Sequence, residues 1–465
     1  MHESLRDAVR TSYWLEDASR PAPLPPLIGA AEADLVVVGG GYTGLWTALL
    51  ARERFPDRSV TLLEAGQCGD QASGRNGGFA SASLTHGFAN GLERWPAELE
   101  VLDRLGAENL REIGATIERL GIDCDWRMSG ELAVATQPHQ VEELHELAAT
   151  LSRHGVEHDV LDAAAARARV DSPTYLGALA LPDETALVEP ARLAWGLRAA
   201  CLDAGVVVHE GSRATSLERD GAGGAGVRVT TDAGWVRAGR VALGTNAFPS
   251  LLRRLRLMTV PVYDYVLMSE PLSDAQLASI GWAGREGIGD SANLFHYYRL
   301  TRDNRILWGG YDAVYHYGSR ISPVLESQGR THGLLAEQFF ETFPQLAGLR
   351  FTHRWAGVID TCTRFSAFFG TAYAGTVAYA LGYTGLGVAA TRFGAQVMLD
   401  LLSGESTERT SLEMVRSKPL PFPPEPFRYA GIKAMTASLE ASDRHEGRRN
   451  LFLRSMDRLG FGFDS

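Results

Sequence analysis

A closely spaced set of glycines is the first feature of this sequence that can do chemistry. Residues 39–44 read Gly-x-Gly-x-x-Gly, directly after the apolar run 34–38 and before a helical pattern. Glycines at this spacing let a strand turn sharply into a helix and bring backbone amides close to a pyrophosphate. Glu64 ends a second apolar run, where a carboxylate binds ribose hydroxyls and repels a 2′-phosphate. The predicted dinucleotide contacts are Gly39, Gly41, Tyr42, Thr43, Gly44, Glu64 and Ala65.

A second glycine-rich segment, residues 72–79, follows soon after that acid. A nicotinamide dehydrogenase does not need it, whereas a flavin needs a second backbone segment at its pyrophosphate and along its ring. Ser73 and Arg75 are expected to contact anionic oxygens, and Gly77 and Gly78 to let the backbone pass the ring. An ordinary surface turn is the alternative. The predicted contacts here are Ser73, Gly74, Arg75, Asn76, Gly77 and Gly78.

A third glycine loop, residues 381–388, leads into the small-residue helix predicted for 388–402. The amides and positive dipole end of such a helix stabilise negative charge, as at the N1–C2=O edge of a reduced flavin. Gly385, Leu386 and Gly387 are the predicted contacts. A glycine motif that only packs a helix is the alternative.

These motifs require a parallel sheet that brings distant segments together. The strand 34–38, the helical pattern from Leu45 to Phe55 and the strand 60–63 form one βαβ unit. Short β segments follow from residue 206 and are expected to contribute Ala214, Gly244 and Thr245. Residues 257–315 alternate aromatic and polar side chains, which is typical of an antiparallel sheet that covers a site.

The three segments, in this order, resemble the D-amino-acid oxidase superfamily of FAD-dependent amine oxidoreductases. Within it the chain is most similar to gamma-glutamylputrescine oxidase-like proteins, through residues 72–78, 85–87 and 297–310. The resemblance covers roughly residues 12–405. It implies an α/β fold, with an FAD-binding Rossmann-like domain of the glutathione-reductase type and an inserted α+β substrate domain on a mixed or antiparallel sheet. It also implies hydride transfer from a C–N carbon to flavin N5, hydrolysis of the imine, and reoxidation by O2 or another acceptor.

The expected domains are interleaved along the chain. An extended N-terminal arm (1–33) precedes a discontinuous FAD-binding domain (34–90, 165–250 and 350–405) and a substrate domain (91–164 and 251–349). Residues 406–465 are expected to form a helical extension docked on the body. Deleting residues 420–465 is then expected to destabilise the fold and leave substrate choice unchanged.

Substrate contacts are expected in the aromatic sheet and beside the flavin loop. Tyr297 and Tyr298 alternate faces, so one of them should face the flavin chamber, and Arg299 suits a substrate carboxylate. The alternatives are structural: an ion pair for Arg299, core packing for the aromatic residues, and a loop-capping imidazole for His86. The sequence offers no convincing histidine–acid pair and no catalytic base. The candidate substrate contacts are His86, Tyr265, Tyr298, Arg299 and Trp355.

Some members of the superfamily bind flavin covalently through a cysteine. Alignment places Asp360, and not Cys362, nearest the linking position, so FAD is predicted to be non-covalent. The four cysteines have no metal-ligand spacing, and no metal site is expected.

Net charge and hydropathy limit the kinds of partner that are expected. The chain has 465 residues and a formal net charge of -11, which argues against nucleic acid as a partner. The N-terminal residues lack the pattern of a signal peptide and no apolar run is long enough to span a membrane, so a cytoplasmic protein with a small amine as substrate is expected. A nicotinamide-dependent dehydrogenase and a flavin-containing assembly protein without turnover remain alternatives, and the amine and the oligomeric state stay open.

Overall fold

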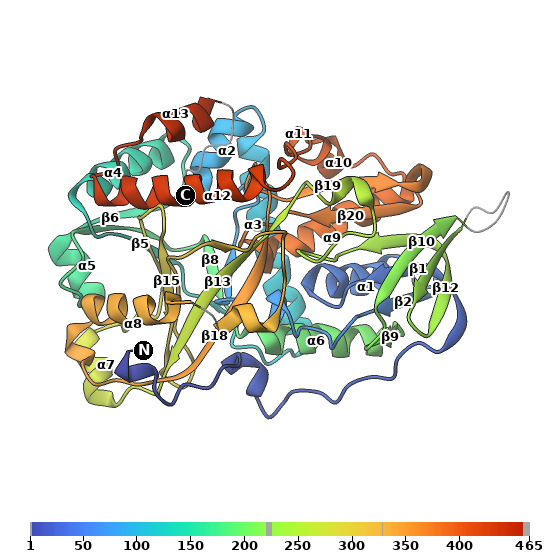
Figure 1. Cartoon of the computed structure of the whole chain (residues 1–465), viewed down its shortest axis with the longest axis horizontal. Helices are drawn as coiled ribbons and strands as arrows, with labels where there is room; N and C mark the ends of the chain where they lie inside the picture. Colours follow the sequence, from blue (N-terminus) through green and yellow to red (C-terminus); the bar gives the residue numbers. More distant parts are fainter. Residues whose placement is uncertain (1, 220–225, 328, 459–465) are drawn as a thin grey trace.

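The computed structural model describes residues 2–219, 226–327 and 329–458. Two large sheets lie side by side, the first on the right of Figure 1 and the second on the left. The α/β fold class expected from the sequence is confirmed. Among the described residues the first sheet contains β10 (Ala214–Arg219), β11 (Val227–Thr231), β12 (Gly234–Leu243), β1 (Gly29–Val38), β2 (Val60–Leu63), β9 (Val207–His209), β19 (Phe368–Ala372) and β20 (Val377–Leu381).

The parallel strands of the first sheet all end at one edge. β1 pairs with β2 and with β12, so that Val38 lies opposite both Leu63 and Leu243, and β20 pairs in parallel with β12. The first and third glycine segments begin at the ends of β1 and β20, and the second, 72–79, follows β2 after a short loop. Carboxyl ends of parallel strands form the usual ligand crevice of such sheets, so the topology brings the segments to one place.

The second sheet carries the aromatic strands. Within the described chain it contains β17 (Val314–Tyr315), β13 (Val260–Ser269), β16 (Ile306–Gly310), β15 (His296–Leu300), β14 (Gly287–Asp290), β5 (Glu131–Ala135), β7 (Gly177–Leu181), β6 (Asp159–Asp162) and β18 (Phe351–Thr361). It is antiparallel except for the pairing of β14 with β5. A small sheet of β3 (Phe79–Ser81), β8 (Thr185–Leu187) and β4 (Arg127–Met128) lies between the two.

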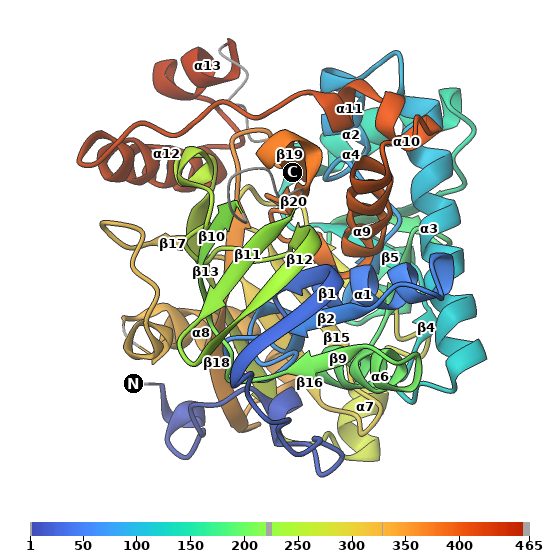
Figure 2. The same cartoon turned by 90° about the vertical axis from the view of Figure 1, so that its right-hand side faces the viewer.

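Helices cover both sheets. Figure 2 shows α1, α9 and α3 gathered on one side of the first sheet, where Asn109 of α3 donates to the carbonyl of Ala389 in α9 at 2.9 Å. None of the helices in the described ranges is both long and apolar enough to cross a membrane. The helices are α1 (Tyr42–Arg54), α2 (Phe88–Arg94), α3 (Leu99–Leu120), α4 (Pro138–Arg153), α5 (Ala163–Arg169), α6 (Pro190–Asp203), α7 (Asp274–Ile280), α8 (Thr331–Thr342), α9 (Gly387–Ser403), α10 (Glu408–Ser411), α11 (Glu413–Arg416), α12 (Phe427–Arg444) and α13 (Leu451–Arg458).

The sheets divide the chain differently from the predicted domain boundaries. β7 lies inside the segment 165–250 assigned to FAD binding, yet it pairs with β5 and β6 of the second sheet. β18 lies inside 350–405, yet it pairs along its length with β13. Strand pairing is non-local, so composition along the chain could not assign these two strands.

The N-terminal arm is shorter than predicted and is not merely laid on the surface. Residues 29–33 already belong to β1. Before them, Leu5 is buried in the core of the second sheet, and the indole N–H of Trp14 donates to the carbonyl of Asn76 at 3.0 Å. The arm therefore connects the second sheet to the flavin loop predicted at 72–79.

Candidate flavin and substrate site

A cavity of about 1520 Å³ runs between the two sheets and is lined by residues from both. Ligand pockets typically measure about 300–1,000 Å³, so this cavity has room for more than one small molecule. Its lining includes the glycine turn 39–44 and Ala214, Tyr297 of β15 and one face of α12. All but Gly44, Gly74 and Gly78 of the predicted cofactor contacts line it, namely Gly39, Gly41, Tyr42, Thr43, Glu64, Ala65, Ser73, Arg75, Asn76, Gly77, Ala214, Gly244, Thr245, Gly385, Leu386 and Gly387.

The first glycine turn has no room for a side chain at Gly39 or at Gly44. Gly39 has φ +108°, and a Cβ there would lie 2.4 Å from the carbonyl oxygen of Gly244. A Cβ on Gly44 would lie 1.8 Å from the carbonyl oxygen of Gly39. Gly44 therefore packs α1 against β1, as the third glycine of such a motif does, and leaves the cavity wall to its neighbours.

Glu64 is held in place at the end of β2. The amide of Gly40 donates to one carboxylate oxygen at 2.6 Å, and the amide of Gly66 donates to the other at 2.7 Å. Burial raises the pKa of Glu64, and these two amides partly oppose that shift. Each oxygen keeps a lone pair, and the side chain lines the cavity, as binding of ribose hydroxyls requires.

The second glycine segment is fastened to the first. The hydroxyl of Ser73 accepts a hydrogen bond from the Tyr42 amide, in the first turn of α1, at 2.9 Å. The guanidinium of Arg75 contacts Glu326 at 2.7 Å and donates to the carbonyl of Asp70 at 2.7 Å. The positions of both predicted anion contacts are thus fixed by the protein itself.

The third segment closes over a buried acid. The amide of Gly382 donates to Asp360 at 2.5 Å, and the chain then enters α9 at Gly387. Asp360 is 2% exposed, and burial raises its pKa to about 7, against the opposing effect of the loop amides. The thiol of Cys362 instead contacts the carbonyls of Ser366 and Gly382 and lies off the cavity wall.

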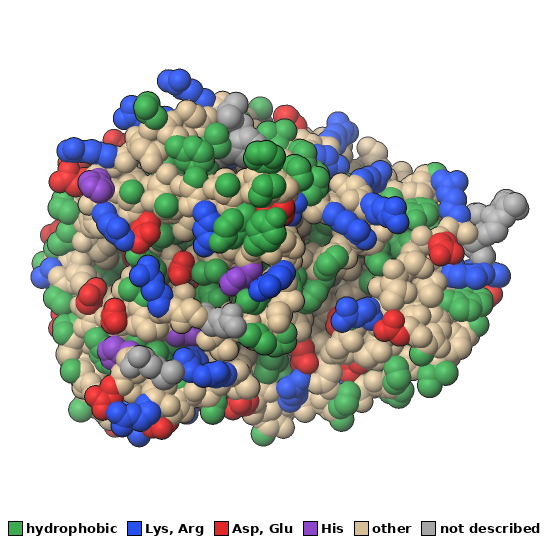
Figure 3. Space-filling model, in the orientation of Figure 1, with side chains coloured by type: hydrophobic (Ala, Val, Ile, Leu, Met, Phe, Trp, Pro, Cys, Tyr) green, Lys and Arg blue, Asp and Glu red, His purple; other side chains and the backbone are tan. Residues whose placement is uncertain are grey.

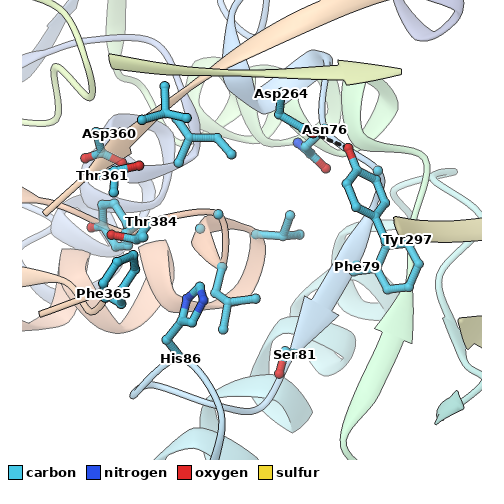
Figure 4. A pocket seen from close by; sticks show the side chains of 18 of the residues that line it. Asn76, Phe79, Ser81, His86, Asp264, Tyr297, Asp360, Thr361, Phe365 and Thr384 are labelled. Atoms are coloured by element: carbon cyan, nitrogen blue, oxygen red, sulfur yellow. Dashed lines mark hydrogen bonds between the residues drawn. The ribbon is translucent and has the colours of Figure 1, made fainter. Parts of the chain in front are cut away.

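Figure 4 shows the middle of the cavity, where two walls face each other. Asp360, Thr384 and Phe365 lie on one wall and Tyr297 on the other. The hydroxyl of Tyr297 donates to Asp264. Burial raises the pKa of Asp264 to about 6, and the Tyr297 hydrogen bond opposes the shift. Sequence reasoning missed Asp264, although an acid between two tyrosines in an apolar strand was a signal.

Of the two neighbouring tyrosines, Tyr297 faces the cavity and Tyr298 does not. The hydroxyl of Tyr298 lies 2.6 Å from that of Tyr175 in the core of the second sheet. Tyr265 lies on β13, which β16 separates from β15; it donates to the carbonyl of Leu325 at 3.0 Å and also lies off the wall. The structure therefore corrects the choice of Tyr298 and Tyr265 as substrate contacts, because strand alternation turns both into the core.

Arg299 and Trp355 are also placed away from the cavity wall. Arg299 is 1% exposed and donates to the carbonyls of Val188 at 2.7 Å and Gly78 at 3.3 Å. The indole of Trp355 donates to the carbonyl of Arg75 at 2.8 Å. Both side chains therefore hold the loop 72–79 against the second sheet. Each has a structural role, and neither forms the predicted substrate contact.

His86 is the one predicted substrate contact that lines the cavity. Figure 4 shows its ring pointing between the two walls. Its Nδ1 is buried without a hydrogen-bond partner among the described residues, and burial lowers the pKa to about 4. The structure also contains a histidine–acid pair that sequence reasoning did not find: His296 Nδ1 lies 2.6 Å from Asp290. Burial would lower the pKa of His296, but Asp290 raises it, and the ring lies off the wall.

Acidic side chains are common on the cavity wall. Burial raises the pKa values of Asp103, Glu131 and Glu184; repulsion from Glu184 adds to the shift at Asp103, and repulsion from Glu131 and Asp183 adds to the shift at Glu184. Three arginines line the whole cavity, Arg75, Arg213 and Arg449. The carboxylates on the wall are more numerous: Glu64, Glu93, Asp103, Glu131, Glu143, Glu146, Glu184, Asp264, Asp290, Asp312 and Asp360. A cationic ligand suits this wall electrostatically.

Comparison with known proteins places the chain in a family. A family model described as FAD dependent oxidoreductase (DAO) matches residues 34–401. The protein is a member of this family. It is 32% identical to gamma-glutamylputrescine oxidoreductase of Escherichia coli K12, over 88% of this chain and 93% of that protein. It is 24% identical to the sarcosine oxidase subunit beta of Rhodobacter capsulatus, over 76% of this chain and 80% of that protein.

Solved structures agree on the fold of this FAD-dependent family member. Glycine oxidase from Geobacillus kaustophilus superposes with a TM-score of 0.69 at 19% identity, over 83% of this chain and 99% of that one. The family membership confirms FAD, and not a nicotinamide nucleotide, as the cofactor.

Proposed function

We propose that this protein uses non-covalently bound FAD to oxidise a C–N bond of an elongated amine, such as gamma-glutamylputrescine. The observation that carries the proposal is the excess of carboxylates over arginines on the cavity wall, because a wall with more acidic than basic side chains attracts a cationic ligand. The similarity to gamma-glutamylputrescine oxidoreductase supports the same substrate class.

The backbone around the cavity fits FAD. At Gly41 a Cβ would lie 2.9 Å from the Ser73 hydroxyl, so the two glycine segments approach each other closely beside the cavity. We assign the turn 39–44 and Ser73 to the pyrophosphate, Glu64 to the adenosine ribose, and Gly385–Gly387 at the start of α9 to the flavin ring. None of the four cysteines, all within the described chain, lines the cavity, which supports non-covalent binding.

When bound, FAD accepts a hydride from the carbon next to nitrogen. The substrate nitrogen loses one proton as the C=N bond forms, and water then converts the imine to a carbonyl compound and the released amine. Asp264, with a pKa of about 6 set by burial, is ionised at neutral pH and attracts the ammonium group to the cavity. His86, whose pKa burial lowers to about 4, is uncharged there and does not repel it.

An amino acid would need a cation for its carboxylate. Arg299, the residue that the sequence offered for that role, donates to backbone carbonyls instead. Arg299 is therefore not available for that role, and a substrate carboxylate, including that of gamma-glutamylputrescine, depends on the arginines of the cavity wall, Arg75, Arg213 and Arg449.

The test is a substrate panel on the purified holoprotein, with gamma-glutamylputrescine, putrescine, sarcosine and glycine. Flavin bleaching without oxygen reports hydride transfer, and peroxide release in air reports the acceptor. We expect gamma-glutamylputrescine to bleach the flavin fastest. Bleaching by glycine or sarcosine in preference would overturn the substrate class, and a flavin that no amine bleaches would overturn the proposed function.

A further inference from the structure

One face of α12 lines the cavity, although this helix lies beyond the segment matched by the family model. Ile432, Met435, Thr436, Leu439 and Ser442 follow one another at the spacing of a single helical stripe. Leu439 is 4% exposed, whereas Ile432 and Met435 are only partly buried.

The start of α12 is fastened to the second sheet. Glu425 accepts hydrogen bonds from the Tyr315 hydroxyl at 2.5 Å and from the Gly318 amide at 2.9 Å. Arg428 donates to the hydroxyl of Ser319 at 2.8 Å. The helix therefore begins at a fixed point next to β17.

The other end of α12 is fastened to the cavity wall itself. Asp443 accepts hydrogen bonds from the amides of Asn293 at 3.0 Å and Leu294 at 3.1 Å, and from the Asn293 side chain at 2.5 Å. Asn293 and Leu294 both line the cavity. Figure 1 shows α12 lying along the top of the second sheet. The stripe is thus a built part of the chamber.

We infer that the stripe of α12 is a specificity-determining wall that contacts the non-reacting aliphatic chain of the substrate. The inference rests on the proposed function. The apolar side chains of the stripe and the carboxylates of other elements line one continuous cavity. Such a cavity fits a ligand with a methylene chain between charged ends. The inference replaces the expectation that loss of residues 420–465 would leave substrate choice unchanged.

Binding of another protein to the outer surface of α12 is an alternative that can be tested. Figure 3 shows hydrophobic side chains gathered in the upper middle of the face where Figure 1 places α12, and Phe427 in that helix is 71% exposed. That outer surface does not line the cavity. A protein partner or a second copy bound there would change the molecular mass in solution without changing the preference for amine length.

The experiment compares Thr436→Trp with the adjacent Ala437→Trp. Thr436 lies on the cavity face and Ala437 on the exposed face of the same turn, so the second variant controls for the bulk and the helix propensity of tryptophan. Leu439→Ala, which enlarges the chamber, provides a second cavity variant should the first not fold. Each protein is checked for flavin content, melting temperature and mass by light scattering.

For Thr436→Trp we expect KM for gamma-glutamylputrescine to rise about tenfold, with KM for short amines such as propylamine nearly unchanged. The rise in melting temperature produced by saturating long-chain amine should shrink in parallel, which measures binding without turnover. Ala437→Trp should leave both properties as in the wild type. Equal effects on long and short amines, or a change in mass without a change in length preference, would overturn the inference. A wild-type protein that oxidises no amine would instead defeat the proposed function.

Discussion

Replacing Gly44 by alanine tests the tight junction between β1 and α1. The added Cβ would lie 1.8 Å from the carbonyl oxygen of Gly39, far inside the 3.4–4 Å of ordinary contact. Overpacking of this kind costs about 3 kcal/mol at the upper end of its usual range, and the helix propensity of alanine returns about 1 kcal/mol. We expect a net loss of about 2 kcal/mol, borne by the turn that carries the predicted pyrophosphate site.

Gly333→Ala is the matched control. Gly333 is the third residue of α8, as Gly44 is the third residue of α1, and nothing lies within 4 Å of a Cβ built there. This variant should keep its FAD and melt at or slightly above the wild-type temperature, because alanine favours a helix by about 1 kcal/mol over glycine.

The assay is titration of each apoprotein with FAD, together with thermal melting of each holoprotein. A strain of about 2 kcal/mol, relieved when the turn opens in the apoprotein, weakens FAD binding by about thirtyfold. If Gly44→Ala binds FAD and melts like Gly333→Ala, the junction is not as tight as the structure shows and the reasoning is refuted.

Three further predictions concern buried polar groups. In Tyr297→Phe, Asp264 loses the donor that opposes the rise of its pKa, so its folded pKa should rise further above the wild-type value of about 6. Below about pH 6 the carboxyl is protonated in both folded proteins, so the melting-temperature deficit of the variant should be constant there and should grow as pH rises above about 6; a deficit independent of pH throughout would contradict this. Cys362→Ala should bind FAD as the wild type does, and acid precipitation should release the flavin from both; flavin retained on the wild-type chain alone would show a covalent link. Arg299→Leu leaves the carbonyl of Val188 without its 2.7 Å donor. The variant should lose about 1–3 kcal/mol of stability, measured by melting, and keep the order of preferred amines. A changed order would restore Arg299 as a substrate contact.

The sequence predicts best where the determinants are local. Gly39, Gly44 and Glu64 could be placed from spacing alone, because a strand, a tight turn and a helix fix their relative positions within one βαβ unit. The structure places the turn directly after β1 and Glu64 directly after β2, but Gly44, predicted as a dinucleotide contact, packs α1 against β1 and does not line the cavity.

Contacts between segments that are distant in the sequence limited what could be predicted of the site. Alternation along β15 showed that Tyr297 and Tyr298 face opposite ways, but only the partners of that strand decide which face meets the cavity. Arg299 resembled a carboxylate binder because its acceptors, the carbonyls of Val188 and Gly78, lie on segments far away in the sequence. The cavity face of α12 was hidden for the same reason, since its partner loop at Asn293 is distant along the chain.

The contacts of Arg299 and Trp355 with the loop after β2 have a practical consequence. They hold that loop and the aromatic sheet together as one block, so the spacing between the coenzyme and the reacting carbon is set by residues outside the chamber. Libraries aimed at new amines can therefore randomise the inward positions of α12 while the redox machinery stays in register. The chain would then separate the loop that holds the coenzyme from the helix that we infer contacts the aliphatic part of the amine.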